Sequence, residues 1–179
     1  NRSAAEGGAF DGPEARRVAF LREAVALGAA YVDIEAATGA GLIRTLRETL
    51  RDQGGATKLV VSWHDFAGTP PARALRKKLR ELMAFEADVV KLVTRAETVA
   101  DTFRVLELIP AARRRGQQIV AFAMGTPGRA SRVLSVMMGA CWTFAALAAG
   151  AESAPGQMTV GETRRLISVL TRGSQNVCP

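Results

Sequence analysis

The sequence predicts an α/β fold built on a parallel β-sheet, and three observations support this. Short apolar runs alternate with longer amphipathic stretches along the 179 residues. The period of the alternation is roughly 29 residues, enough for one strand, one helix and their connections. Gly and Pro stand mainly at the boundaries of these segments. Strands that alternate with helices imply parallel pairing through right-handed crossovers.

The strand candidates are short and rich in β-branched residues, as buried parallel strands are. We expect strands at residues 31–35, 58–62, 88–93, 118–123 and, on a weaker pattern, 141–147. Helices are expected between and around them, at residues 13–28, 40–53, 71–86, 97–112, 129–138 and 160–171. Pro13 and Pro71 suit a first helical turn, and Gly28 and Gly116 suit helix ends.

Composition narrows the class of protein. Apolar residues make up 48% and charged residues 23% of the chain, a globular balance. No apolar run approaches the roughly 18 residues of a membrane span, so no membrane association is expected. Two Cys, one of them near the C-terminus, make neither a disulfide framework nor a metal site and fit a cytoplasmic location. The net charge of +7 comes from basic residues that are interleaved with acids, so nucleic-acid binding is not favoured.

The same strand period suits an open doubly wound sheet or a closed (βα)8 barrel. A doubly wound nucleotide-binding sheet normally has a glycine-rich turn after its first strand, and none is found here. Polar residues instead recur at successive strand ends: Glu35, His64 and Lys91 stand 29 and 27 residues apart. In a barrel such positions meet at one rim, where catalytic groups lie, and this favours the barrel.

Lys91 is the strongest candidate for chemistry. It lies inside the apolar run 88–93, where burial disfavours an ammonium group and leaves a neutral amine that can attack a carbonyl. Two structural interpretations stay open: a lysine that extends to the strand end, or one that is paired with an acid.

His64, Arg132 and the segment 151–157 are the other candidates. His64 is the sole histidine and suits proton transfer near neutral pH, although a lone histidine is more often structural. Arg132 begins a helix and could bind a carboxylate through both guanidinium nitrogens, or could simply face solvent. The segment 151–157 is either an ordinary turn or a flap that offers a hydroxyl and an amide to a ligand.

Together these residues resemble one family, the type I 3-dehydroquinate dehydratases (3-dehydroquinases), which are (βα)8-barrel lyases of the shikimate pathway. Six motifs occur in the family's order over essentially the whole chain, so the resemblance is specific. They are Arg2-Ser3-Ala4-Ala5-Glu6-Gly7-Gly8, Val32-Asp33-Ile34-Glu35, Ser62-Trp63-His64-Asp65-Phe66, Asp88-Val89-Val90-Lys91, Met124-Gly125 through Ser131-Arg132, and Ser153-Ala154-Pro155-Gly156-Gln157.

The resemblance implies a role for each matched residue. Lys91 would form an imine with the ketone of 3-dehydroquinate, His64 would move the protons, and Glu6 would orient His64. Arg132 would hold the substrate carboxylate; Arg2, Ser153, Ala154 and Gln157 would contact the substrate, and Met124 and Phe144 would supply apolar walls. Glu35 stays outside the catalytic set because its family position looks structural. The resemblance implies no metal and no organic cofactor, and it makes a homodimer plausible.

The match begins near the end of the family's third strand. We therefore expect residues 1–172 to be the C-terminal two-thirds of one barrel domain, reaching through its eighth helix, and residues 173–179 to be a tail. Two alternatives remain at this point. One is a Schiff-base aldolase of the barrel class, which would use the same lysine strand. The other is a non-catalytic truncated barrel that acts as an assembly module.

Overall fold

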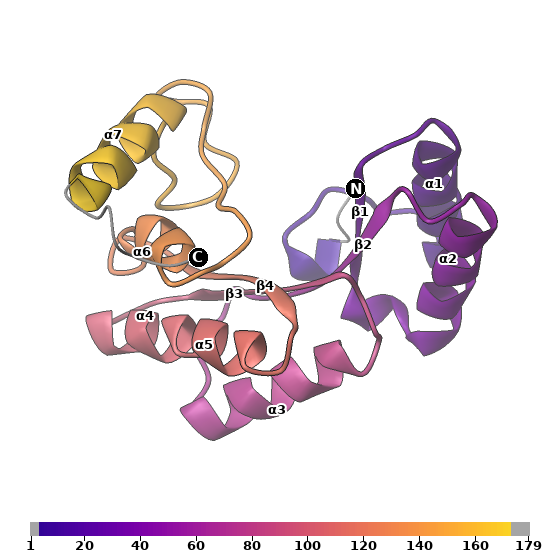
Figure 1. Ribbon diagram of the computed structural model, residues 1–179, viewed down its shortest axis with the longest axis horizontal. Helices are drawn as coiled ribbons and strands as arrows, with labels where there is room; N and C mark the ends of the chain where they lie inside the picture. Colours follow the sequence, from indigo (N-terminus) through magenta and orange to yellow (C-terminus); the bar gives the residue numbers. More distant parts are fainter. Residues whose placement is uncertain (1–3, 173–179) are drawn as a thin grey trace.

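The computed structural model describes residues 4–172, and these form a parallel sheet with helices packed around it (Figure 1). The sheet has the strand order β1-β2-β3-β4, and all three neighbouring pairs are parallel. The strands are β1 (Tyr31–Glu35), β2 (Lys58–Asp65), β3 (Val89–Arg95) and β4 (Gln118–Met124). The predicted α/β class and the first four predicted strands are therefore confirmed.

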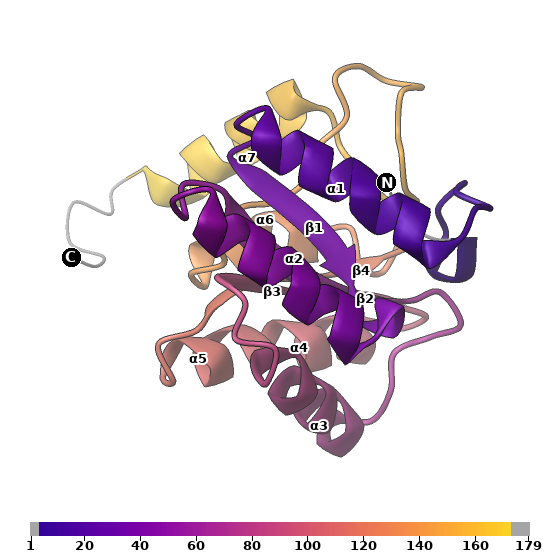
Figure 2. The same ribbon diagram turned by 90° about the vertical axis from the view of Figure 1, so that its right-hand side faces the viewer.

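Seven α-helices surround the described sheet. Figure 1 shows α1 and α2 at one end of the sheet, α3, α4 and α5 beneath it, and α6 and α7 at the other end, while Figure 2 brings α1 and α2 to the front. Short 3₁₀ turns occur at Ala4–Glu6 and Ala36–Thr38. The helices are α1 (Glu14–Ala26), α2 (Ala40–Asp52), α3 (Ala72–Met83), α4 (Val99–Leu106), α5 (Leu108–Arg113), α6 (Ser131–Met137) and α7 (Val160–Thr171).

The two faces of the sheet have different partners. Ile34, Val61 and Leu92 belong to the main core, which the sheet shares with the helices, and each is fully buried. Alternate residues point to the other, inner face, where Val93 and Phe122 belong to a smaller apolar cluster. Asp33, Glu35, His64 and Lys91 also fall on this inner face, opposite to the face that packs on the main core.

The register between β2 and β3 places two of the predicted catalytic residues close together. Ser62 stands opposite Lys91, and two residues later His64 stands opposite Val93. Lys91 and His64 therefore share the inner face on adjacent strands. His64 lies within β2 rather than just beyond its end as we expected, because the β2 ladder continues to Asp65.

The helix expected at 97–112 is two helices, α4 and α5, which meet at Glu107. Pro110 explains the break. Proline has no backbone N–H, and its ring crowds the carbonyl four residues earlier, here that of Leu106, so one continuous helix is disfavoured. Thr98 and Asp101 form a capping box at the start of α4, which fixes where this pair of helices begins.

The fifth expected strand, at 141–147, is wrong. The Cys141 amide donates to the Ile119 carbonyl at 2.9 Å, as a strand beside β4 would, but the ladder stops there. Only an isolated bridge follows, between Ala146 and Thr159. Trp142 instead packs on the inner-face cluster, so tertiary contact overrides the local strand pattern. No helix in residues 4–172 is long and apolar enough to cross a membrane.

Candidate active site

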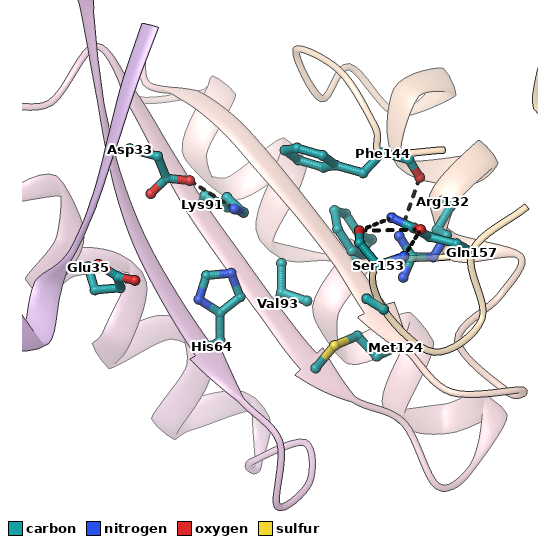
Figure 3. A pocket seen from close by; sticks show the side chains of 12 residues that line it. Asp33, Glu35, His64, Lys91, Val93, Met124, Arg132, Phe144, Ser153 and Gln157 are labelled. Carbon is teal, nitrogen blue, oxygen red and sulfur yellow. Dashed lines mark hydrogen bonds and ion pairs between the residues drawn. The ribbon is translucent and has the colours of Figure 1, made fainter. Parts of the chain in front are cut away.

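A cavity of about 260 Å³ lies on the inner face of the sheet, and polar side chains from several strands meet in it (Figure 3). Its walls come from all four strands, from α6 and from the segment before α7. The lining residues are Asp33, Glu35, His64, Lys91, Val93, Phe122, Met124, Arg132, Phe144, Ser153, Ala154 and Gln157.

Lys91 enters this cavity from the middle of β3. Its side chain is 11% exposed, and Nζ donates to Asp33 Oδ2 at 2.8 Å. The ammonium also lies 4.9 Å from the centroid of the Phe144 ring, a cation–π distance. We expected an uncharged amine; the structure shows the other possibility left open by the sequence, a lysine paired with an acid.

His64 is held by a carboxylate from the N-terminal segment. Glu6 Oε2 accepts from the His64 backbone N–H at 2.9 Å and lies 2.7 Å from the ring atom Nδ1. Both side chains are buried. When Nδ1 carries the proton that Glu6 accepts, Nε2 is left as the basic nitrogen. Figure 3 shows the His64 ring within the cavity, below Lys91 and between Glu35 and Val93 in the view.

Arg132 is a buried cation, only 1% exposed. Its guanidinium donates to the Pro155 carbonyl at 3.1 Å and to the Phe144 carbonyl at 3.4 Å, and it lies 4.5 Å from the centroid of the Phe122 ring. Burial lowers the pKa of Arg132 to about 10, so the group stays charged at neutral pH. Within residues 4–172 this guanidinium forms no ion pair and its Nε has no hydrogen-bond partner. It is therefore ready to receive an anion.

The segment before α7 closes over Arg132 and holds itself together through side chains. Gln157 Oε1 accepts from the Ser153 amide at 2.8 Å, and Gln157 Nε2 donates to Ser153 Oγ at 3.1 Å. Ala154 packs against the inner-face cluster. The segment thus presents a hydroxyl, an amide and a methyl group to the cavity, and their mutual bonds can be exchanged for bonds to a ligand.

Comparison with known proteins points to one family. The family model of type I 3-dehydroquinase matches residues 1–174. The chain is 37% identical over 167 residues to the 3-dehydroquinate dehydratase of Syntrophobacter fumaroxidans, covering 93% of this chain and 69% of that protein. It is 38% identical over 164 residues to the corresponding protein of Dehalococcoides mccartyi strain BAV1, covering 90% and 69%. The chain belongs to the type I 3-dehydroquinase family.

A solved structure from this family agrees. The crystal structure of 3-dehydroquinate dehydratase from Geobacillus kaustophilus superposes with a TM-score of 0.88 at 30% identity, covering 97% of this chain and 67% of that one. The parallel sheet and its helices are thus those of a type I 3-dehydroquinase, a barrel-like α/β enzyme. This family consists of hydro-lyases, so the chain is an enzyme.

All but two of the residues predicted for a 3-dehydroquinase site line the cavity. Arg2 lies outside the described residues, and Glu6 lies behind His64 rather than at the cavity surface. The other predicted residues all line the cavity: His64, Lys91, Met124, Arg132, Phe144, Ser153, Ala154 and Gln157. Glu35 lines it as well, but its carboxylate is paired with the fully buried Arg17 of α1, which suits the structural role assigned to it.

Asp33 is the site residue that the sequence reasoning missed. It is the ion-pair partner of Lys91 and lies on β1, two residues before Glu35. A usable signal was present, since two carboxylates spaced by two in a strand point to the same face.

Proposed function

We propose that this chain dehydrates 3-dehydroquinate to 3-dehydroshikimate through an imine on Lys91. One observation carries the proposal: the Lys91 amine, the His64 imidazole and the Arg132 guanidinium line a single cavity. A nucleophilic amine, a proton carrier and an anion receptor are the groups that imine-based dehydration of a keto acid needs. The cavity volume of about 260 Å³ is of the order expected for a site that holds a small molecule.

The first step is formation of the imine. The Lys91 amine must lose a proton before it attacks the substrate ketone, and the Asp33 carboxylate at 2.8 Å is the acceptor nearest to Nζ among its described hydrogen-bond partners. Attack gives a carbinolamine, which loses the ketone oxygen as water and leaves a protonated imine. The positive charge of this iminium acidifies the neighbouring carbon.

The second step is elimination. His64 Nε2 removes a proton from the carbon next to the iminium, which gives an enamine and an imidazolium. The enamine expels the hydroxyl group one carbon further on, and the imidazolium supplies the proton that turns this group into water. Glu6, bound at Nδ1, stabilises the charged ring during this interval. Water then hydrolyses the conjugated iminium, which frees the product and returns Lys91.

The remaining lining residues bind the substrate. Arg132 replaces its two carbonyl contacts with the substrate carboxylate, since charge-assisted bonds are the stronger ones. Ser153 and Gln157 exchange their mutual bonds for substrate hydroxyls, with Ala154 beside them. Met124 and Phe144 form apolar walls, and we also assign Arg2 to substrate binding. No residue of this scheme requires a metal or an organic cofactor.

We propose in addition that residues 1–172 form the part of a (βα)8 barrel from the end of its third strand to its eighth helix. The coverage of 67% of the Geobacillus chain supports this placement. A cytoplasmic location and a homodimer also stay predictions. Leu166, Val169 and Leu170 of α7, which are 42–54% exposed, give a second copy an apolar surface, and light scattering of the purified chain tests for it.

Borohydride trapping tests the imine. The protein is incubated with 3-dehydroquinate, reduced with borohydride, digested and analysed by mass spectrometry. We expect the adduct on the peptide that contains Lys91 and none on the peptides that contain Lys58, Lys77 or Lys78. Absorbance of the conjugated enone should rise in a parallel unreduced sample. An adduct on another lysine, or one that forms only with a retro-aldol substrate, would overturn the proposal.

A further inference from the structure

A second cavity lies at the same rim of the sheet, next to the first, and Arg95 lines it. Resting on the proposed function, we propose that this cavity is an entry site where the substrate carboxylate binds Arg95 before it reaches Arg132. Its ligand is therefore a small carboxylate. The observation behind this is that the two cavities share Met124 and are separated by the segment 153–157.

Arg95 is placed by β3 itself. It is the last residue of that strand and lies on the inner face with Lys91 and Val93, since alternate residues share a face. Four residues separate Lys91 from Arg95, which is about 13 Å along a strand. Arg95 also stands opposite Met124 in the β3–β4 register. A strand thus holds this cation above the reacting lysine, at the distance of an outer site and not of a direct contact.

The guanidinium of Arg95 is exposed and, within the part of the chain that the structure describes, forms no ion pair or hydrogen bond through its side chain. The cavity around it measures about 750 Å³, nearly three times the inner one at about 260 Å³. Phe66, Pro127 and Pro155 give it apolar walls. A cation that forms no ion pair, in a partly apolar hollow, attracts a small organic anion.

The wall between the two cavities is one short segment. Ser153, Ala154 and Gln157 line the inner cavity, whereas Pro155 lines the outer one. The wall is fastened to β4 by a long hydrogen bond of 3.4 Å from the Gly125 amide to the Pro155 carbonyl. The same carbonyl accepts from Arg132 at 3.1 Å. When the segment moves aside, the two hollows join and Arg132 loses a partner, so the carboxylate can replace it.

Glu97 lines the outer cavity as well, and it gives the proposal a second, opposite test. Its carboxylate repels an anion that approaches Arg95. Removing the charge of Arg95 should therefore slow substrate capture, whereas removing that of Glu97 should speed it. A role confined to folding would not produce effects of opposite sign from two neutral replacements in one cavity.

The test compares Arg95→Gln, Glu97→Gln and Arg114→Gln. Arg114 follows α5 at the opposite end of the strands, so its replacement changes net charge by the same amount as Arg95→Gln but far from the rim. Association of 3-dehydroquinate is followed by stopped-flow tryptophan fluorescence; the chain has two tryptophans, of which Trp142 packs on the inner-face cluster and Trp63 on the main core. The three variants are made in a Lys91→Met background, so that the result does not depend on catalysis.

We expect Arg95→Gln to lower the association rate constant about fivefold, Glu97→Gln to raise it and Arg114→Gln to leave it nearly unchanged. The differences should shrink as salt is raised. In the Lys91 enzyme, Arg95→Gln should lower kcat/KM and leave kcat unchanged. Equal effects of Arg95→Gln and Arg114→Gln, or a loss that salt does not alter, would overturn the entry site. Absence of an imine adduct on the unsubstituted protein would instead overturn the proposed function.

Discussion

The strand-borne half of the site and the loop-borne half are positioned by different forces. Lys91 and His64 sit on adjacent strands whose register is set by backbone hydrogen bonds, so their separation is fixed by the sheet. Arg132 is the second residue of the short helix α6, and Ser153 and Gln157 lie in an irregular segment that side-chain and carbonyl contacts hold in place. The chemistry is thus attached to the rigid part of the molecule, and recognition to the part that can rearrange.

The two halves also differ in how their charges are balanced. Lys91 has the carboxylate of Asp33, and His64 has that of Glu6. Among the described residues, Arg132 has two carbonyl groups and the Phe122 ring as partners and no carboxylate, and burial lowers its pKa to about 10. A substrate carboxylate would supply the missing negative charge. The binding half is therefore electrostatically incomplete without an anion, whereas the catalytic half is complete.

The largest expected effect is that of Lys91→Met, which removes the nucleophile. We expect kcat to fall about 10⁴-fold or more, because no other described group in the cavity can form an imine. Enone absorbance measures the activity, and circular dichroism checks the fold. Lys58→Met is the control, since Lys58 is half exposed and pairs with Asp88 away from the cavity. Comparable losses in both variants would contradict this assignment.

A smaller loss is expected for His64→Ala. General acid–base groups contribute typically 10²–10⁴-fold, so we expect kcat to fall about 10³-fold while borohydride still traps the substrate on Lys91. Glu6→Gln should cost less, about 10-fold to 100-fold, because it removes only the charge that stabilises the imidazolium. Loss of the trapped adduct in His64→Ala would show that this residue acts in imine formation rather than in elimination.

The catalytic residues on the strands could be predicted from the sequence more directly than the substrate-binding residues of α6 and the segment before α7. The catalytic half was accessible because a polar residue in an apolar strand is a local anomaly, as Lys91 is in 88–93. The position of Asp33 also follows from the sequence, because residues two apart in a strand point to the same face, here that of Glu35. For the binding half, the residues alone left Arg132 and the segment 151–157 as candidates with a structural alternative each, and the family resemblance favoured the binding role. Nothing in the pattern around 151–157 indicates that the segment folds back over Arg132.

The fold errors have a related origin. Pro110 indicates a helix break, whereas the amphipathic pattern of 97–112 favours one continuous helix. The prediction of a single helix followed that pattern and was wrong. At 141–147 the apolar pattern is real, but Trp142 and Phe144 use it to pack on the inner-face rings and not to extend the sheet. Local patterns predict an element when backbone pairing decides its state, and they fail when tertiary packing does.

Substitution of a substrate-binding residue should lower activity less than substitution of a catalytic residue does. Arg132→Lys measures the size of this smaller effect. Lysine keeps the positive charge but loses the planar pair of donors that now bind the Phe144 and Pro155 carbonyls. We expect kcat/KM to fall about 30-fold, mostly through a higher KM, with the Lys91 adduct still formed at saturating substrate. A fall in kcat with unchanged KM would mean that Arg132 acts on the reacting atoms.

The smallest effect is expected at the wall between the two cavities. A Cβ at Gly156 would lie 2.7 Å from the Gly125 carbonyl oxygen, which is backbone and cannot turn away. Gly150 is the matched control: it has a similar positive φ, 84° against 78°, but nothing lies within 4 Å of the added carbon. Both Ala variants share the backbone strain, about 1–2 kcal/mol, so the difference between them isolates the contact with β4. We expect KM to rise about fivefold more in Gly156→Ala than in Gly150→Ala, with similar kcat, because a displaced segment presents Ser153 and Gln157 poorly. Equal KM values would show that the closed position of this segment contributes nothing to substrate binding, and recognition would then rest on Arg132 of α6 and on the strands.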